Sequence, residues 1–136
     1  MIDVQPGQKI IDLGCGNGQT LVLICQKYNL LGIGYESTLW GYWLTRVNIY
    51  RYRLGKQVHV LKKDFYQADI SAADIVYLYL LPPVLKKLSP KLEKELKTGS
   101  RIISYAFPLP NWQPRQIISA PSNSKIKIFS YQFPVK

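Results

Sequence analysis

The segment from Ile10 to Glu36 constrains the fold of this chain more than any other part of the sequence. It opens with IIDLGCGNG, continues through a helical stretch and a second apolar strand, and ends at an acid. Glycine has no Cβ, so the glycines let the turn take unusual backbone angles and let a ligand lie against the main chain. We expect Asp12 and Glu36 at the carboxyl ends of two strands, where ligands of open α/β sheets bind. This order predicts a pocket for an adenosine-type ligand.

The spacing of the glycines narrows the type of ligand. They stand at Gly14, Gly16 and Gly18, whereas a dinucleotide fingerprint needs Gly or Ala where this chain has Gln19. The sequence also contains no GxxxxGK[ST] phosphate loop. Glu36 follows Gly14 by 22 residues, near the ~20 typical of an acid that accepts ribose hydroxyls. The alternative is a tight strand-to-helix turn with incidental acids.

Length and composition fit one small globular domain over residues 1–136, with 47% hydrophobic residues. No apolar run approaches the ~18 to 20 residues of a membrane span, and no basic segment followed by an apolar stretch marks a secretory signal. Cys15 and Cys25 form no CxxC pair, so neither a metal site nor a disulfide framework is expected. A reducing cytoplasm is therefore the expected location.

Apolar periodicity predicts alternating strands and helices. Strands are expected at 9–13, 31–35, 57–61, 74–79 and 101–107, helices at 18–28 and 38–53, and a hairpin from 116–120 and 125–133. Residues that recur at helical spacing are Leu21, Ile24, Cys25 and Tyr28 in the first helix, and Leu39, Trp43, Val47 and Tyr50 in the second. After Pro83 the pattern indicates a broken helical region, with Ser89 as N-cap, Pro90 at the first helical position and Gly99 as the stop. The expected fold is α/β, a doubly wound and mostly parallel sheet with a C-terminal antiparallel hairpin.

The form Asp12-x-Gly14-x-Gly16-x-Gly18 resembles motif I of the class I methyltransferases that use S-adenosylmethionine. Other segments resemble one branch of that superfamily, the seven-β-strand protein-lysine methyltransferases. These segments are GYES at 34–37, YLYLLPPV at 77–84, and PKLEKELKTGSRIISYAFPLPNW at 90–112. The branch includes the mitochondrial enzymes that act on the ATP synthase c-subunit and the adenine nucleotide translocase, together with archaeal relatives. The similarity covers nearly the whole chain, and the segments YLYL at 77–80, PKLEKELK at 90–97 and FPLPNW at 107–112 carry the branch assignment.

The resemblance implies a Rossmann-like fold with a seven-stranded sheet, and S-adenosyl-L-methionine as cofactor. The residues that it implies in cofactor binding are Asp12, Gly14, Cys15, Gly16, Gly18, Glu36, Asp64, Phe65 and Tyr79. In this arrangement Asp64 accepts from the adenine amino group, while Phe65 offers a backbone amide and an apolar face. Considered without the resemblance, Asp64 is a loop acid and Phe65 a core aromatic.

The implied reaction is methyl transfer to a lysine side chain of a protein substrate. It requires an uncharged amine and a dry site, without a metal or a nucleophilic triad. Aromatic walls that bury the amine lower its pKa, and Tyr79 and Phe107 are the candidates for such walls. The alternative is that these aromatics pack the core, which is the reading we favour for Trp112. His59, the one histidine, falls within an expected strand and is read as structural rather than catalytic.

Two other functions stay open, a nucleic-acid methyltransferase and a cofactor-binding module without catalytic activity. The net charge of +10 favours an anionic partner such as nucleic acid, an acidic protein face or anionic lipid, although solvated helix faces explain most of the basic residues. Against base methylation, Leu81-Pro82-Pro83-Val84 lacks the polar residue and the stacking ring that grip a flipped base. A non-catalytic cofactor-binding module is the third possibility. Relatives in the branch carry an N-terminal cover segment, most of which we expect this domain to lack.

Overall fold

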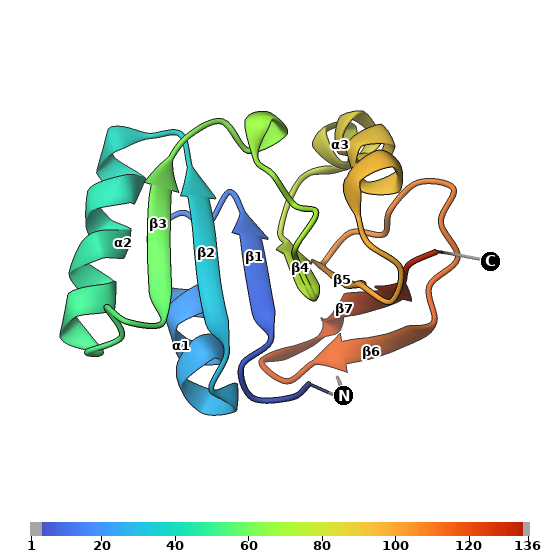
Figure 1. The fold of residues 1–136 in the computed structure, drawn as a ribbon. Coiled ribbons are helices and arrows are strands. Elements are labelled where there is room, and N and C mark those ends of the chain that lie inside the picture. Colours follow the sequence, from blue (N-terminus) through green and yellow to red (C-terminus); the bar gives the residue numbers. More distant parts are fainter. Residues whose placement is uncertain (1–3, 135–136) are drawn as a thin grey trace. The chain divides into compact units, whose positions relative to one another are not determined.

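The computed structural model describes residues 4–134. Within them the chain forms seven strands, three α-helices and one short 3-10 helix (Figure 1). The chain divides into two compact units, one that ends at Ala68 and one that begins at Asp69. The strands follow one another along the sequence as predicted, with bounds that differ by at most two residues.

The first unit contains three parallel strands in the order β3-β2-β1. Its elements are β1 (Lys9–Leu13), α1 (Gln19–Tyr28), β2 (Leu31–Glu36), α2 (Leu39–Arg51), β3 (Val58–Lys62) and the 3-10 helix η1 (Phe65–Gln67). Helices α1 and α2 contact each other as well as the strands, so both cover the same face of this part of the sheet. Figure 1 shows α2 beside β3 and α1 behind β2.

Two glycines in β2 allow α1 and the preceding turn to pack closely on that strand. A Cβ at Gly32 would lie 2.6 Å from the Cys25 sulfur, and one at Gly34 would lie 2.8 Å from the Cys15 sulfur. A glycine inside a strand commonly marks such a close approach. The sequence LGIGYE is therefore a buried strand whose missing side chains make room for two thiols.

The two helices of the first unit differ in how well their hydrophobic residues predict the buried face. In α1, Leu21 and Cys25 of the predicted stripe are buried together with Val22, while Tyr28 is 43% exposed. In α2 the four residues that recur at helical spacing do share a face, but that face is exposed. The side chains turned inward are small or polar, namely Gly41 and Thr45, together with Ile49. The small residues let α2 lie close to the turn that precedes α1.

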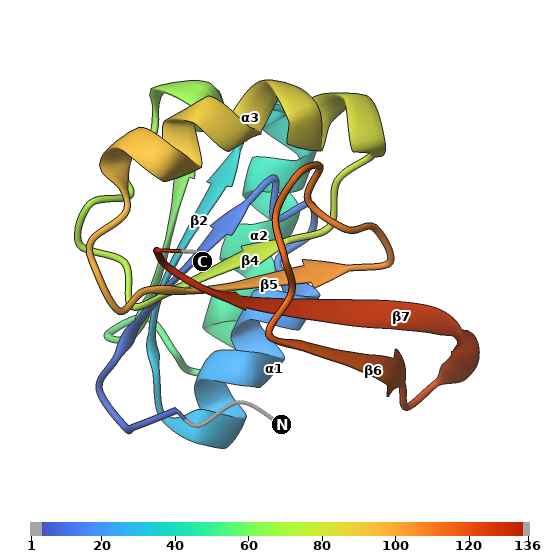
Figure 2. The ribbon, with the colours of Figure 1, turned by 90° about the vertical axis from the view of Figure 1, so that its right-hand side faces the viewer.

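The second unit contains four strands in the order β4-β5-β7-β6. Its elements are β4 (Ile75–Leu78), α3 (Pro82–Glu95), β5 (Arg101–Tyr105), β6 (Gln116–Ala120) and β7 (Asn123–Gln132). Strands β4 and β5 are parallel, whereas β7 runs antiparallel to both β5 and β6. The predicted hairpin is confirmed, with a tighter turn than expected. It extends well past the end of β5 (Figure 2).

Helix α3 is continuous, so the prediction of a broken helix is wrong. It begins after Leu81, with proline at its first positions, and contains Pro90 in its interior. Ser89 is not an N-cap, because its hydroxyl donates to the Leu85 carbonyl one turn earlier at 2.9 Å. The helix ends at Glu95, and Gly99 follows later in a left-handed turn with φ 92°. The stripe of Leu85, Leu88 and Leu92, all fully buried, runs past the proline and holds the two halves together.

Aromatic packing defines the core of the second unit around Tyr131. This residue is fully buried, and its hydroxyl accepts from the Leu109 backbone N–H at 2.8 Å. The Trp112 ring meets it edge to face, with centroids 6.1 Å apart, and lies 6.2 Å from the Phe133 ring. Trp112 is only 9% exposed, which confirms its assignment to the core.

Candidate functional site

The turn between β1 and α1 depends on three glycines in the left-handed region, with φ 78° at Gly14, 59° at Gly16 and 75° at Gly18. L side chains rarely adopt such angles. The backbone N–H groups of Gly14 and Cys15 both donate to the Tyr35 carbonyl, at 2.9 and 3.1 Å, and so tie the turn to β2. A Cβ at Gly16 would meet nothing within 4 Å. The main chain at Gly16 therefore faces open space, as a ligand cradle requires.

Glu36, at the end of β2, faces this turn as the sequence predicts. Its Oε1 accepts from the Gly16 backbone N–H at 3.1 Å. Its Oε2 accepts from the backbone N–H of Thr38 at 3.2 Å and from the Thr38 hydroxyl. These bonds hold the carboxylate in one orientation beside the bare main chain. The acid and the glycine turn thus form a single site.

Two residues of α2 that no sequence motif indicated hold the turn from behind. The Thr45 hydroxyl lies 2.8 Å from both the Gly16 and the Gly41 carbonyl oxygens and shares its hydrogen between them. The Asn48 amide donates to the Asn17 carbonyl at 2.8 Å. The sequence does contain a signal for them. Thr45 and Asn48 lie on the same side of a largely apolar helix, and this polar side faces the turn.

Thr45 also explains why the last glycine of the turn cannot be replaced. A Cβ at Gly18 would lie 2.4 Å from the Thr45 methyl carbon. The Asn17 side chain completes the turn, because its Oδ1 accepts from the Gln19 backbone N–H at 3.0 Å. Residues 15 to 18 therefore form an ordered turn that leads into α1.

Asp12 lies under the turn near the end of β1 and is only 4% exposed. Burial, and after it the nearby Glu36 carboxylate, raise the pKa of Asp12 to about 7. Two carboxylates therefore stand close together where the main chain is bare. Such a pair attracts a positively charged ligand, because a cation relieves both the desolvation and the repulsion.

The surroundings of the two thiols beside the site disfavour the nucleophilic thiolate form. Burial, with Asp12 as the next cause, raises the pKa of Cys15 and of Cys25 to about 12 in each case. Both cysteines are free of disulfides. The Cys15 sulfur instead lies 3.7 Å from the Thr45 hydroxyl and helps to fill the space beneath the turn. Its contribution to the site is its position in the turn.

Asp64 and Phe65 follow β3 in the first unit, as predicted. The Asp64 carboxylate accepts from the Tyr66 backbone N–H at 2.9 Å and so caps η1. Phe65 is half-buried, with its ring edge to face against Tyr66 at 4.6 Å between centroids. Because Glu36 and Lys62 are partners in the β2–β3 ladder, both strands end level with each other. The roles of Asp64 and Phe65 in binding adenine stay predictions.

Tyr79 and Phe107 belong to the second unit. Tyr79 follows β4, is 58% exposed, and packs against Tyr105 with ring centroids 4.8 Å apart. It is therefore not a core residue. Phe107 follows β5 and is half-buried, and its carbonyl accepts from the Ser104 hydroxyl at 2.5 Å. Their predicted role as walls around the substrate stays a prediction.

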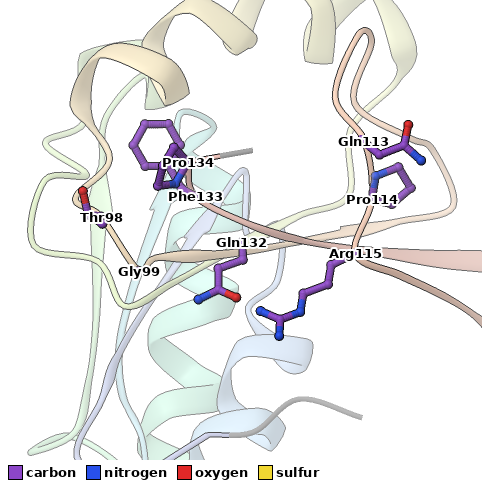
Figure 3. A pocket seen from close by; sticks show the side chains of 8 residues that line it. All are labelled: Thr98, Gly99, Gln113, Pro114, Arg115, Gln132, Phe133 and Pro134. Atoms are coloured by element: carbon purple, nitrogen blue, oxygen red, sulfur yellow. The ribbon is translucent and has the colours of Figure 1, made fainter. Parts of the chain in front are cut away.

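The second unit also contains a hollow of about 500 Å3, drawn in Figure 3. Its lining residues come from the turn before β5, the segment before β6 and the end of β7: Thr98, Gly99, Gln113, Pro114, Arg115, Gln132, Phe133 and Pro134. Arg115 is the charged residue among them, and none is a histidine, cysteine or carboxylate. The lining therefore has no group for acid–base catalysis or metal binding near neutral pH.

A search of residues 4–134 finds no cluster of three or more histidine, cysteine or carboxylate side chains arranged to hold a metal ion. His59, which the sequence analysis read as structural, lies in β3 with an exposed side chain. Over the same residues, none of the helices has the length and the apolar character needed to cross a membrane.

The described residues fit a cationic nucleoside such as S-adenosylmethionine. The open face at Gly16 suits close approach of the ligand to main chain, the Glu36 carboxylate can accept from a diol, and the buried Asp12 favours positive charge. A phosphate-bearing dinucleotide fits less well, because two carboxylates would repel it. The site thus selects by charge as well as by shape.

Comparisons with known proteins agree with this site. A model of the ANTKMT methyltransferase domain family matches residues 12–116. A protein-lysine N-methyltransferase of Saccharolobus islandicus is 34% identical over 110 residues, which are 80% of this chain and 68% of that protein. An adenine nucleotide translocase lysine N-methyltransferase of Mus musculus is 34% identical over 114 residues, or 84% of this chain. This chain spans about half of the mouse relative, 49% of its length.

Among solved structures, an RNA methyltransferase from Salinibacter ruber in complex with S-adenosyl-L-homocysteine has a TM-score of 0.88 and 27% identity. The match covers 95% of this chain and 82% of that one. This likeness confirms the predicted Rossmann-like α/β fold, and the bound product confirms S-adenosylmethionine as the cofactor type. The chain therefore belongs to the ANTKMT methyltransferase domain family and is an S-adenosylmethionine-dependent methyltransferase domain.

Proposed function

We propose that this chain transfers a methyl group from S-adenosylmethionine to the side-chain amine of a protein lysine. The observation that carries this proposal is the 34% identity, over most of the chain, to proteins named as lysine N-methyltransferases. The site supports it, because the bare main chain at Gly16, the Glu36 carboxylate and the buried Asp12 fit a cationic nucleoside. In this proposal the domain binds the cofactor and the substrate lysine, orients them toward each other and excludes water.

The bound cofactor supplies a methyl group already activated on a sulfonium, so the protein need not generate a strong electrophile. The glycine turn and Glu36 would hold the adenosyl part, and Asp12 would balance the positive charge of the sulfonium. The substrate amine would lose its proton to solvent before it accepts the methyl group. Tyr79 and Phe107 would provide the aromatic walls that favour a neutral amine. The exposure of Tyr79 supports its availability.

The direct test is transfer of tritiated methyl groups into a cell lysate, followed by digestion with protease or nuclease. We expect protease-sensitive label that is absent when the lysines of the lysate have been blocked by exhaustive reductive methylation. Phe107→Ala should slow transfer without changing cofactor affinity, whereas Tyr79→Ala should weaken both. Label that survives lysine blocking would contradict the proposal.

Methylation of RNA is the second candidate. It is favoured by the net charge of +10 and by the likeness to a solved structure named as an RNA methyltransferase. The tetrapeptide from Leu81 to Val84 argues against a flipped base, since it contains no polar amide or aromatic ring. The same experiment separates the two candidates, because RNA methylation gives label sensitive to nuclease. A cofactor-binding module without activity would bind S-adenosylmethionine and transfer no label at all.

We also propose a cytoplasmic location and an anionic partner. The two free thiols support a reducing compartment, and the excess of basic residues supports the partner. Fractionation of cells that express the full-length protein tests the location. Recovery with an organelle would contradict it.

A further inference from the structure

The outward face of α2 is apolar, although it is exposed. Five large side chains lie on it, and their exposed fractions are 59% for Leu39, 76% for Trp40, 51% for Trp43, 52% for Val47 and 85% for Tyr50. At about 100° per residue these five fall within an arc of about 100°. We call this surface the α2 outer face. Single exposed apolar residues are ordinary, but a contiguous group of this kind marks an interaction site.

Positive charge borders the α2 outer face on both sides. Arg46 lies at one edge of the arc and Arg51 at the other, and the helix sequence LWGYWLTRVNIYR contains no acid. The Arg46 guanidinium lies 5.2 Å from the centre of the Trp43 ring, so charge and aromatic surface are in contact. The partner must therefore offer both apolar depth and negative charge.

The α2 outer face has no part in the packing of the first unit. The helix packs through Gly41, Thr45 and Ile49 on its opposite side. Nothing in the architecture of the first unit requires two tryptophans and a tyrosine on the outside of a helix. Exposure of a contiguous apolar group to water is unfavourable, so these side chains indicate a binding surface.

We propose that the α2 outer face docks on an anionic lipid surface. Tryptophan and tyrosine are the residues that favour the membrane–water boundary, and a surface with apolar side chains between basic residues suits an anionic bilayer, which attracts the cations. Arg46 and Arg51 would reach the headgroups while the five apolar side chains enter the acyl boundary.

Two other occupants suit the face less well. A second copy packed face to face would bring the arginines of both chains together without an acid between them. A single-stranded nucleic acid would use the aromatic rings but would leave Leu39 and Val47 without a role.

The test is sedimentation of this chain with phosphatidylcholine vesicles, with and without phosphatidylserine. We expect binding that requires the anionic lipid and a blue shift of tryptophan fluorescence, since Trp112 is buried and Trp40 and Trp43 are exposed. Trp43→Ser combined with Val47→Ser should lower the partition coefficient at least about tenfold. A matched control is Ile117→Ser, which removes a comparably exposed side chain in β6 and should bind like the wild type.

Charge is tested separately with Arg46→Glu and Arg51→Glu combined, against Lys86→Glu and Lys94→Glu combined in α3. Only the first pair should lower vesicle binding by about tenfold or more. Circular dichroism checks that each variant is folded.

Three results would overturn the proposal. The first is equal binding of the wild type and the Trp43/Val47 variant to vesicles, or no binding by either. The second is a concentration-dependent dimer that the same variant abolishes. The third is loss of RNA binding in that variant without any vesicle binding by the wild type. The readout is binding rather than activity, so the outcome does not depend on the proposed function.

Discussion

At the scale of single residues, the buried carboxyl of Asp12 makes cofactor binding depend on pH. Its pKa is raised to about 7, chiefly by burial, and a bound cation lowers that pKa again because it favours the ionised form. Binding therefore releases a proton, and affinity should rise as pH increases through 7. We expect roughly tenfold tighter binding of S-adenosylmethionine at pH 8 than at pH 6, measured by isothermal titration calorimetry.

Two controls accompany this prediction. Neutral methylthioadenosine should bind with little pH dependence, and Asp12→Asn should remove the dependence for S-adenosylmethionine. Because the folded state prefers protonated Asp12, the free energy of unfolding of the wild type falls as pH rises from about 4 to 7. Asp12→Asn should therefore be more stable than the wild type at pH 8, on the order of 2–4 kcal/mol. A steep pH dependence in the variant would assign the titration to another group.

Glu36 has two roles that substitutions can separate. Its carboxylate holds the Gly16 N–H and Thr38 within the protein, and it faces the space expected for the ribose. Glu36→Gln keeps an acceptor for Gly16 but removes the charge, whereas Glu36→Ala removes both. We expect about tenfold or more weaker cofactor binding in the glutamine variant and near-complete loss in the alanine variant, by calorimetry. Undiminished affinity in the alanine variant would disprove the cofactor assignment.

Gly16→Val should block cofactor binding, because the valine side chain would fill the open space beside the main chain of the turn.

At the scale of elements, α2 supports the glycine turn through Thr45 and Asn48. Thr45→Val keeps the shape of the side chain but cannot donate to the Gly16 carbonyl, and Asn48→Leu likewise cannot donate to Asn17. Each should lower the free energy of unfolding by about 1–2 kcal/mol, and each should weaken cofactor binding. Urea unfolding and calorimetry measure the two effects. Val47→Thr, on the exposed side of the same helix, should change neither.

Helix α3 contains a proline in its interior, and this position can be improved. Pro90 has no N–H to donate to the Lys86 carbonyl, and its ring crowds that carbonyl. Pro90→Ala should therefore stabilise the chain by about 1–3 kcal/mol, visible as a higher midpoint of thermal unfolding. Pro83→Ala should have a smaller effect, since proline is tolerated at the start of a helix. A lower midpoint for Pro90→Ala would mean that the proline ring itself is needed for packing of the leucine stripe.

At the scale of the whole molecule, the sequence predicts the order of elements and the glycine–acid site because both depend on local signals. Gly14, Gly16, Gly18 and Glu36 have the predicted geometry, since bare main chain and strand ends follow from the pattern itself. The orientation of α2 did not follow. The most hydrophobic residues of α2 recur on one face, but the close approach through Gly41 and Thr45 turns the opposite face inward. Continuity of α3 through Pro90 likewise depends on tertiary packing of its leucines.

The glycines of β2 have a further consequence. Because the fully buried Cys25 sulfur occupies the place where a side chain at Gly32 would stand, this thiol can meet a reagent only when α1 and β2 separate. The rate of its alkylation by an excess of iodoacetamide in native buffer should therefore equal the rate at which this pair of elements opens. Cys25 is thus a native reporter of local opening, whereas Cys15 is partly exposed and needs no such opening. Saturating S-adenosylmethionine should slow the modification of Cys25.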